Sequence, residues 1–287
     1  MIQGKGRWAS VMLPALFLVA FLVLPLLLMG VMSVRPRLQG GIFNTDWTPT
    51  LDHYQTVFES GSFLPLLGTS ARIALLVGCL ATLLAYPLAY FLVFRAGRRA
   101  SVLLVLLILP FWTSYLLRVI AWKIILGSNG AINSFLLYSG MIEEPSPLLL
   151  YNRSAVVVTL VYVWLPFVAL PIYAALLRVD RSWLEAAGSL GATRRQTFLK
   201  VTLPLSLPGV VAGFLMVFIP TVGEYVAPIL VGGTRGSMYG NIIETFFGDG
   251  INWPLGSALA FIMLGCVLVV VVIAVKTLRV DRMLEES

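Results

Sequence analysis

Long apolar runs constrain the fold of this chain more than any other feature of its sequence. The segments 11–34 and 255–275 contain 24 and 21 residues, and neither segment carries a charge. A helix needs about 20 apolar residues to cross roughly 30 Å of hydrocarbon. Soluble domains have about 25% charged residues, whereas this chain has 11%. The sequence therefore predicts an all-α polytopic membrane protein.

Hydropathy predicts about six transmembrane helices within a single domain that covers residues 1–287. The first apolar run is longer than the 7–15 residues of a signal-peptide core, and no small-residue cleavage site follows it. We therefore expect it to be a retained span. The expected spans are 11–34, 68–94, 102–126, 154–178, 207–232 and 255–277.

Lysine and arginine are distributed unevenly between the two sides of a six-span arrangement. One side carries thirteen of them and the other carries four. The positive-inside rule then places both termini in the cytoplasm. The net charge of +7 is thus a signal of topology, and we expect no nucleic-acid partner. The thirteen are Lys5, Arg7, Arg95, Arg98, Arg99, Arg178, Arg181, Arg194, Arg195, Lys200, Lys276, Arg279 and Arg282, and the four are Arg35, Arg37, Arg153 and Arg235.

The link between the fourth and fifth spans, residues 180–207, has the most informative pattern in the chain. Ser182 and Glu185 have the spacing of a capping box, which predicts a short helix beginning at Trp183. Gly191 is placed to end that helix in a left-handed conformation, which glycine adopts at low cost.

A second short helix is expected directly after the first. Thr193 and Gln196 have capping-box spacing, and the helix is expected to run through Lys200. Leu203-Pro204 and Pro208 are expected to break the chain and restart it into the fifth span.

One face of the first short helix is nearly smooth. Leu184, Ala187, Gly188 and Gly191 follow one another at helical spacing. A smooth, glycine-weakened helix suits insertion into a groove on another protein, where backbones must come close. The alternative is an ordinary amphipathic linker that lies on the membrane.

The same link resembles the "EAA" signature of permeases from ATP-binding-cassette (ABC) importers. The matching residues are Glu185-Ala186-Ala187, then Gly191, then Val201-Thr202-Leu203-Pro204, with Val201 standing where isoleucine is commoner. The resemblance implies a coupling helix that docks in a cleft of a cytoplasmic ATPase subunit. The coupling residues that it implies are Glu185, Ala186, Ala187, Gly188, Gly191, Leu203 and Pro204.

Further short segments are similar to spermidine/putrescine transport permeases, although permeases for opines and other organic cations share them. The segments are Ile108–Ser114 with Arg118, Val163–Phe167, Gly223-Glu224-Tyr225 with Gly232-Gly233, and Asn252–Gly256. The resemblance implies a multi-pass protein of the bacterial inner membrane that imports a polyamine or a related organic cation. It also implies an ATPase dimer, a second permease subunit, identical or different, and an extracytoplasmic solute-binding protein as partners. ATP and Mg²⁺ would bind the ATPase, and this chain would hold no cofactor.

The fifth span is expected to be discontinuous, because Pro220, Gly223 and Pro228 interrupt it. Irregular backbone at membrane depth is tolerated where it lines a wet cavity or is packed in protein. Glu224 lies in this stretch, and a carboxylate there favours a polyammonium substrate. The competing interpretation is a structural ion pair with Arg118, Lys123 or Arg72.

Aromatic residues provide a second candidate for the substrate pathway. Trp112, Tyr115 and Trp122 would share one stripe of a continuous third span, and Tyr225 follows Glu224. Aromatic faces attract ammonium groups by about 0.5–2 kcal/mol each. Aromatic residues near a membrane boundary are more commonly anchors or packing residues. The tentative pathway set is therefore Glu224, Tyr225, Tyr115, Trp112 and Arg118.

The sequence has no recognisable catalytic constellation, so we do not expect an enzyme. Its single histidine, His53, has no carboxylates at metal-ligand spacing, and no phosphate-binding loop of the GxxxxGK[ST] type is present. Energy for transport would have to come from a separate subunit. The rival from another class is an ion-coupled secondary transporter, which needs its own ion site and has no use for the signature in the link 180–207.

Overall fold

The computed structural model describes residues 12, 14–36, 48–248 and 252–277. Helices and turns make up these residues, and no strand occurs among them. Five of the basic residues on which the predicted topology depends lie outside the described residues. They are Lys5, Arg7, Arg37, Arg279 and Arg282.

Six helices among the described residues are long and apolar enough to cross a membrane. The all-α class with six long apolar helices is therefore confirmed, while the cytoplasmic placement of the termini stays a prediction. The six candidate spans are Pro14–Ser33, Phe63–Phe94, Tyr115–Tyr138, Arg153–Leu177, Arg194–Val222 and Trp253–Ala274.

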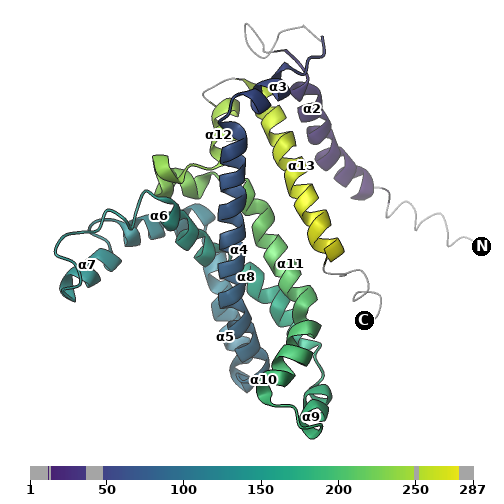
Figure 1. Cartoon of the computed structure of the whole chain (residues 1–287), viewed down its shortest axis with the longest axis vertical. Coiled ribbons are helices and arrows are strands. Elements are labelled where there is room, and N and C mark those ends of the chain that lie inside the picture. The colour runs from purple at the N-terminus through teal and green to yellow at the C-terminus, as the bar shows by residue number, and fades with distance from the viewer. Residues whose placement is uncertain (1–11, 13, 37–47, 249–251, 278–287) are drawn as a thin grey trace, which may run out of the picture. The chain divides into compact units, whose positions relative to one another are not determined.

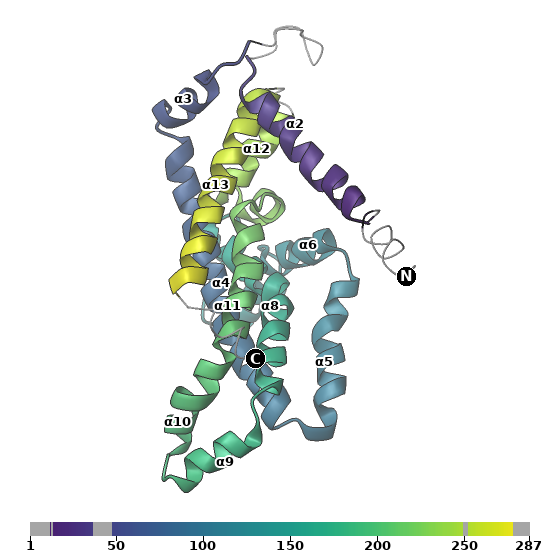
Figure 2. The same cartoon turned by 90° about the vertical axis from the view of Figure 1, so that its right-hand side faces the viewer.

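The third candidate span differs from the expected range of 102–126. Helix α5 (Ala100–Ile108) passes into the short turn η3 (Leu109–Trp112), the backbone is extended at Thr113, and α6 (Tyr115–Leu126) begins anew. Pro110 contributes to this interruption, because proline has no N–H to donate to a preceding turn. Helices α5 and α6 consequently run in different directions (Figure 2). Helix α7 (Ala131–Tyr138) follows α6.

Contacts along the chain divide it into two compact units, which we describe separately. Unit 1 comprises Met1–Pro65 and Ile242–Cys266, and unit 2 comprises Leu66–Asn241 and Val267–Ser287. The expectation of a single domain over the whole chain stays a prediction.

Unit 1 contains η1 (Val19–Val23), α2 (Leu24–Ser33) and α3 (Asp52–Glu59), together with parts of α12 (Tyr239–Phe247) and α13 (Trp253–Thr277). A Cβ atom at Gly30 of α2 would lie 3.4 Å from the Phe261 ring of α13, so the small residue permits close packing. The buried His53 places Nε2 2.8 Å from the carbonyl oxygen of Arg35. This histidine therefore has a local structural partner on the chain.

Unit 2 is built around α8 (Arg153–Leu177), which runs through its apolar core. Helices α4 (Phe63–Phe94) and α11 (Leu203–Val222) lie beside α8 in Figures 1 and 2. The buried side chains of α4 and α8 are mostly alanine, valine, leucine and isoleucine. The alanines among them are small enough to let neighbouring helices approach closely.

Two glycines bring α11 against α8 at backbone distance. A Cβ atom at Gly209 would lie 2.5 Å from the carbonyl oxygen of Pro171, and one at Gly213 would lie 2.9 Å from that of Val168. The spacing of Gly209 and Gly213 is that of the GxxxG motif, which mediates close packing of membrane helices. This motif was not among the sequence predictions.

The link from α8 to α11 and the link from α4 to α5 lie at the same end of unit 2 (Figures 1 and 2). The first link carries α9 (Arg181–Ser189), α10 (Arg194–Thr197) and the π-helical turn η4 (Phe198–Thr202). The second carries the 3₁₀ turn η2 (Gly97–Arg99). We call this end of unit 2 the loop end.

Candidate functional site

Helix α9 begins two residues earlier than the sequence predicts. Its N-cap is Asp180, whose Oδ1 accepts a hydrogen bond of 2.9 Å from the backbone N–H of Ser182. The predicted cap of Ser182 with Glu185 is therefore wrong, because the helix starts two residues earlier and its first free amides are those that Asp180 reaches. Hydrogen bonds from Ser182 hold the pKa of the Asp180 carboxyl below its usual range. The bond from the Ser182 backbone has the larger effect and the bond from its side chain the smaller.

The end of α9 follows the prediction. Gly191 adopts φ +83°, in the left-handed region, and its N–H donates to the carbonyl oxygen of Gly188. Ala192 N–H in turn donates to the carbonyl oxygen of Ala187 at 3.0 Å. These bonds satisfy carbonyl groups that a helix end otherwise leaves unpaired.

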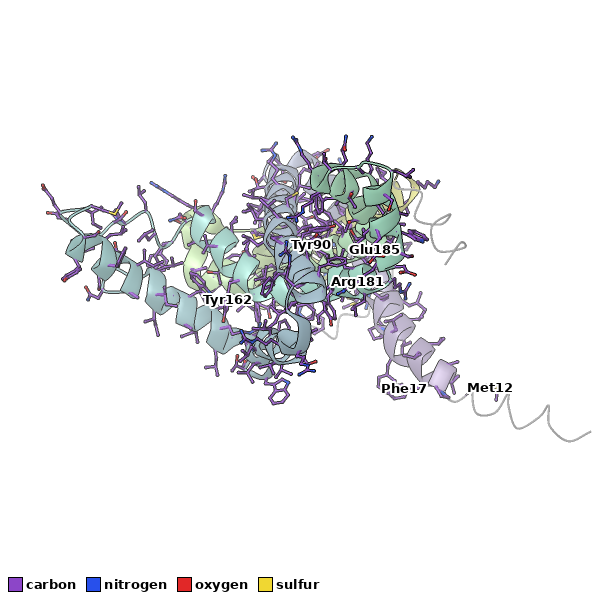
Figure 3. All side chains as sticks on the ribbon, turned by 90° about the horizontal axis from the view of Figure 1, so that it is seen from below. Met12, Phe17, Tyr90, Tyr162, Arg181 and Glu185 are labelled. Carbon is purple, nitrogen blue, oxygen red and sulfur yellow. The ribbon has the colours of Figure 1, made fainter. Side chains whose placement is uncertain are left out.

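Helix α9 is poorly buried in this chain. Glu185, Ala186 and Gly188 are exposed, and Leu184 and Ala187 are half-buried. Leu190, which caps the helix, is 89% exposed, and Trp183 is 55% exposed. Figure 3 is viewed from the loop end and shows Arg181 and Glu185 on this helix. A polar segment that exposes large apolar side chains is typical of a surface that another protein covers.

The second capping box is present as predicted. Thr193 Oγ1 accepts from the N–H of Gln196, and Gln196 Oε1 accepts from the N–H of Thr193 at 2.8 Å. The helix then continues through η4 into α11 without a break, so the interruption expected at Leu203-Pro204 and Pro208 is not observed. Pro204 stands in the first turn of α11, where the missing N–H costs little.

An aromatic contact joins η4 to α4 near the loop end. The Phe198 ring packs edge-on against Tyr86 and Tyr90, with centroid separations of 5.7 and 6.0 Å. The Tyr86 hydroxyl is also 2.9 Å from Ser206 Oγ on α11. We call Tyr86, Tyr90 and Phe198 the aromatic contact. It connects the segment that follows α9 directly to a long helix of unit 2.

The fifth span is discontinuous, as the sequence predicts, although not at every predicted point. Helix α11 includes Pro220 and ends at Val222, with Gly223 at its C-cap. A short helical turn begins again at Val226 and includes η5 (Pro228–Gly232). The backbone then turns through Gly233 at φ +57° into η6 (Thr234–Gly236).

Glu224 lies in this break and is 9% exposed. Its Oε1 accepts hydrogen bonds from the backbone N–H groups of Tyr225, Val226 and Ala227, at 3.1, 2.8 and 3.2 Å. All three bonds go to Oε1, and Oε2 takes part in none of them. A carboxylate is well suited to this position, since the free N–H groups of a helix start attract negative charge.

The ion pair with Arg118, Lys123 or Arg72, which was the competing interpretation of Glu224, does not form among the residues that the structure describes. Arg118 instead places its guanidinium 4.7 Å from the centre of the Phe111 ring, and its Nη1 donates to the carbonyl oxygen of Val163 at 3.4 Å. Lys123 lies over the Tyr151 ring at 6.0 Å. The charge of Glu224 is therefore held by backbone amides.

A second segment holds the break in place. The side chain of Asn241 donates from Nδ2 to the carbonyl oxygen of Tyr225 at 2.9 Å and accepts from the N–H of Met238 at 2.8 Å. A Cβ atom at Gly240 would lie 2.4 Å from the carbonyl oxygen of Gly223. The two backbones thus touch with no side chain between them. Sequence reasoning did not pair these segments, because residues 223 and 240 are linked only by the fold.

The aromatic candidates are placed differently from one another. Tyr115 has a buried hydroxyl that interacts with the Glu224 carboxylate and with the Arg118 charge. Tyr225 is 44% exposed beside Glu224, whereas Trp112 is 84% exposed. Trp112, Tyr115 and Trp122 do not form one helical stripe, because the chain is interrupted at Thr113.

These features together define a protein with six candidate membrane spans, an exposed helical loop and a broken helix. The family described as "Binding-protein-dependent transport system inner membrane component" matches residues 6–285 of the chain. The chain therefore belongs to this family and is the permease subunit of an ABC importer, a multi-pass protein of the inner membrane.

Curated relatives agree with this assignment, and a solved structure shares the fold. The chain is 38% identical over 224 residues to the spermidine/putrescine transport system permease protein PotB of Escherichia coli (strain K12), covering 77% of this chain and 81% of PotB. It is 34% identical over 265 residues to PotB of Haemophilus influenzae, covering 90% and 89% of the two chains. A chain in the crystal structure of a bacterial alginate ABC importer matches with a TM-score of 0.71 at 18% identity, over 95% of this chain and 94% of that one.

Membership of this family has direct consequences for energy supply. A permease of this kind is not itself catalytic and carries no cofactor, and it works with an ATPase and a solute-binding protein. Membership of this family therefore excludes the alternative of an ion-coupled secondary transporter.

Proposed function

We propose that this chain is a permease subunit of a polyamine importer that acts on spermidine, putrescine or a closely related organic cation. The observation that carries the proposal is its identity of 34–38% to permeases named for spermidine and putrescine, over most of their length. A buried carboxylate at the helix break, Glu224, is chemically consistent with a cationic substrate.

In the proposed assembly this chain pairs with a second permease subunit, so that the pathway lies between the two. Two ATPase copies bind inside and a solute-binding protein binds outside, with both termini of this chain in the cytoplasm. Exposed α9 is proposed to insert into the ATPase through Glu185, Ala186, Ala187, Gly188 and Gly191, with Leu203 and Pro204 joining it to α11. Closure of the ATPases on ATP would move α9, and transport requires contacts that differ between the inward- and outward-facing states.

Glu224 is proposed to line the substrate pathway in addition to capping the short helix. Oε1 is engaged by three backbone amides, and Oε2 is the atom proposed to meet an ammonium group. Tyr115 and Tyr225 would offer aromatic surface to the same cation. Arg118 and Trp112 complete the proposed pathway set. The Arg118 charge acts on Tyr115, and Trp112 is mostly exposed, as a residue that faces a pathway between two subunits would be.

The substrate proposal is tested by uptake in cells that lack this chain. The complemented strain is given labelled spermidine, putrescine, an opine and an amino acid derivative in separate assays. We expect saturable uptake of one or both polyamines that requires the chain. Uptake confined to the opine or the amino acid derivative would reassign the importer.

The role of Glu224 is tested by comparing two substitutions in the assembled transporter. Glu224→Gln keeps an acceptor oxygen for the three amides but removes the charge, whereas Glu224→Ala removes both. If the charge meets substrate, Glu224→Gln assembles normally and loses uptake, while Glu224→Ala also lowers assembly. Unimpaired uptake by Glu224→Gln would leave the carboxylate with its capping role alone.

A further inference from the structure

The turn between α4 and α5 brings three arginines together at the loop end of unit 2. Helix α4 ends at Phe94, η2 spans Gly97–Arg99, and α5 begins at Ala100. Gly97 adopts φ +53°, which lets the chain reverse within a few residues. The short link leaves Arg95, Arg98 and Arg99 little room to separate.

These arginines line a cavity of about 570 Å³, together with Phe91, Ala96 and Leu103. No carboxylate is among the lining residues, and none of the three guanidinium groups has a hydrogen-bond or ion-pair partner in the described part of the chain. All three arginine residues are exposed. Three like charges that share one cavity repel one another, and an anion placed between them would relieve this repulsion.

The apolar wall of the cavity narrows the chemistry of that anion. Phe91 is 47% exposed and stands in the last turns of α4, and Leu103 stands in the first turn of α5. Val102, beside Leu103, is 62% exposed, so apolar surface continues from the cavity along α5. A ligand that suits both the arginines and the apolar wall of the cavity carries a phosphate at one end and hydrocarbon at the other.

We propose that the cavity formed by Phe91, Arg95, Arg98, Arg99 and Leu103 binds the headgroup of an anionic phospholipid, with the acyl chains lying along α5. Basic pockets at the cytoplasmic ends of membrane helices bind acidic headgroups, and each Lys or Arg near such a surface contributes about 1 kcal/mol. Guanidinium groups also bind phosphate in a bidentate manner. The proposal rests on the proposed orientation of the chain in the membrane, and it is independent of the transported substrate.

The experiment measures lipid retained by the purified transporter complex with native mass spectrometry. The complex is exposed to equal amounts of phosphatidylglycerol and phosphatidylcholine, whose headgroups differ in net charge. The test variant is Arg98→Gln/Arg99→Gln. The matched control is Arg178→Gln/Lys200→Gln, which removes the same charge from exposed positions outside the cavity.

We expect the parent complex and the control to retain phosphatidylglycerol in preference to phosphatidylcholine. The test variant should lose about tenfold or more of that preference, since two arginine contacts are removed. An unchanged preference in the test variant, or an equal loss in the control, would overturn the proposal.

Two further arms separate the lipid from other anions. Inorganic phosphate at millimolar concentration should not displace the bound phosphatidylglycerol, because it lacks the hydrocarbon part. Displacement would reassign the cavity to a soluble phosphate. Loss of the ATPase from the Arg98→Gln/Arg99→Gln complex with lipid retention unchanged would reassign it to an acidic protein surface. The single variant Arg98→Gln provides the same readout if the double variant does not assemble.

Discussion

Phe198 packs edge-on against Tyr86, with ring centroids 5.7 Å apart and ring planes at 88°. Phe198 begins η4, the segment that follows the exposed loop, and Tyr86 lies on α4 with its hydroxyl beside Ser206 of α11. This pair therefore gives the exposed loop a direct contact with a long helix of unit 2. The following predictions test that contact and the local structures around it.

Phe198→Ala should weaken the connection between the loop and α4. The change removes two aromatic contacts, each worth about 0.5–1.5 kcal/mol beyond buried area, so we expect a loss of about 1–3 kcal/mol in stability. If the contact transmits movement, uptake per ATP hydrolysed should fall while the ATPase remains bound. Leu199→Ala changes a neighbour that is 48% exposed and serves as the control. Equal effects of the two substitutions would argue against a specific role for Phe198.

Gly188→Trp should abolish co-purification of the ATPase. A Cβ atom at Gly188 meets no atom within 4 Å, so the chain itself tolerates a larger residue there. Gly191→Trp is expected to have the same result, but the left-handed φ of +83° adds local strain to the steric effect. Gly188→Trp therefore separates docking from folding.

The control for this docking test is Ser182→Trp, which places the same bulk on another face of α9. It should retain the ATPase at close to the parent level. If Gly188→Trp also retains the ATPase, the smooth face of α9 is not the docking surface.

Asp180 should make the start of α9 sensitive to acid. Its pKa is lower in the folded chain than in the unfolded chain, because the Ser182 N–H and hydroxyl bond to the ionised carboxylate. The stabilising contribution is therefore fully present above the unfolded pKa of about 3.9 and is lost as the pH falls through the lower folded pKa. Hydrogen exchange at α9, corrected for intrinsic rates, should quicken only below about pH 4.

Two substitutions check the origin of that acid sensitivity. Asp180→Asn keeps a capping oxygen that does not titrate, so its exchange should show no step below pH 4. Asp180→Ala should show faster exchange already at neutral pH. If exchange in Asp180→Asn still quickens below pH 4, a titrating group other than Asp180 causes the acid sensitivity.

Gly240→Ala should strongly reduce assembly of the transporter. The added Cβ would lie 2.4 Å from the carbonyl oxygen of Gly223 and 2.7 Å from that of Glu224, and both are backbone atoms that cannot rotate away. We expect a loss of at least about 3 kcal/mol in stability. Gly68→Ala, where a Cβ meets nothing within 4 Å, is the control and should assemble normally. Normal thermal stability of Gly240→Ala would show that the break opens to admit a side chain.

Features that depend on neighbouring residues could be predicted from the sequence. The left-handed Gly191 and the capping box of Thr193 with Gln196 formed as expected, because spacing within one turn determines both. The interruption of the fifth span at Gly223 was also expected, because glycine and proline residues cluster there. The first cap was assigned to Ser182, since aspartate and serine are equally good caps and only the backbone path places Asp180 first.

Features that depend on tertiary contacts could not be predicted in this way. The three amides that bind Glu224 follow it directly in the sequence, but the contact of Asn241 with Tyr225 at the same break exists only in the folded chain. The extended backbone at Thr113 likewise removes Trp112 from the face of Tyr115, which a continuous helix would have retained. Hydropathy identifies an apolar stretch without showing where its direction changes.

The direct meeting of the Gly240 and Gly223 backbones limits how this part of the protein can move. Neighbouring helices that touch through side chains can slide when rotamers change. Two peptide groups in direct contact have no rotamers, so they cannot adjust in this way. The hydrogen bonds of Asn241 to Tyr225 and Met238 fasten the same junction on either side. Any tilt of the short helix after Glu224 must therefore move residues 238–241 with it, so that the two segments behave as one rigid unit.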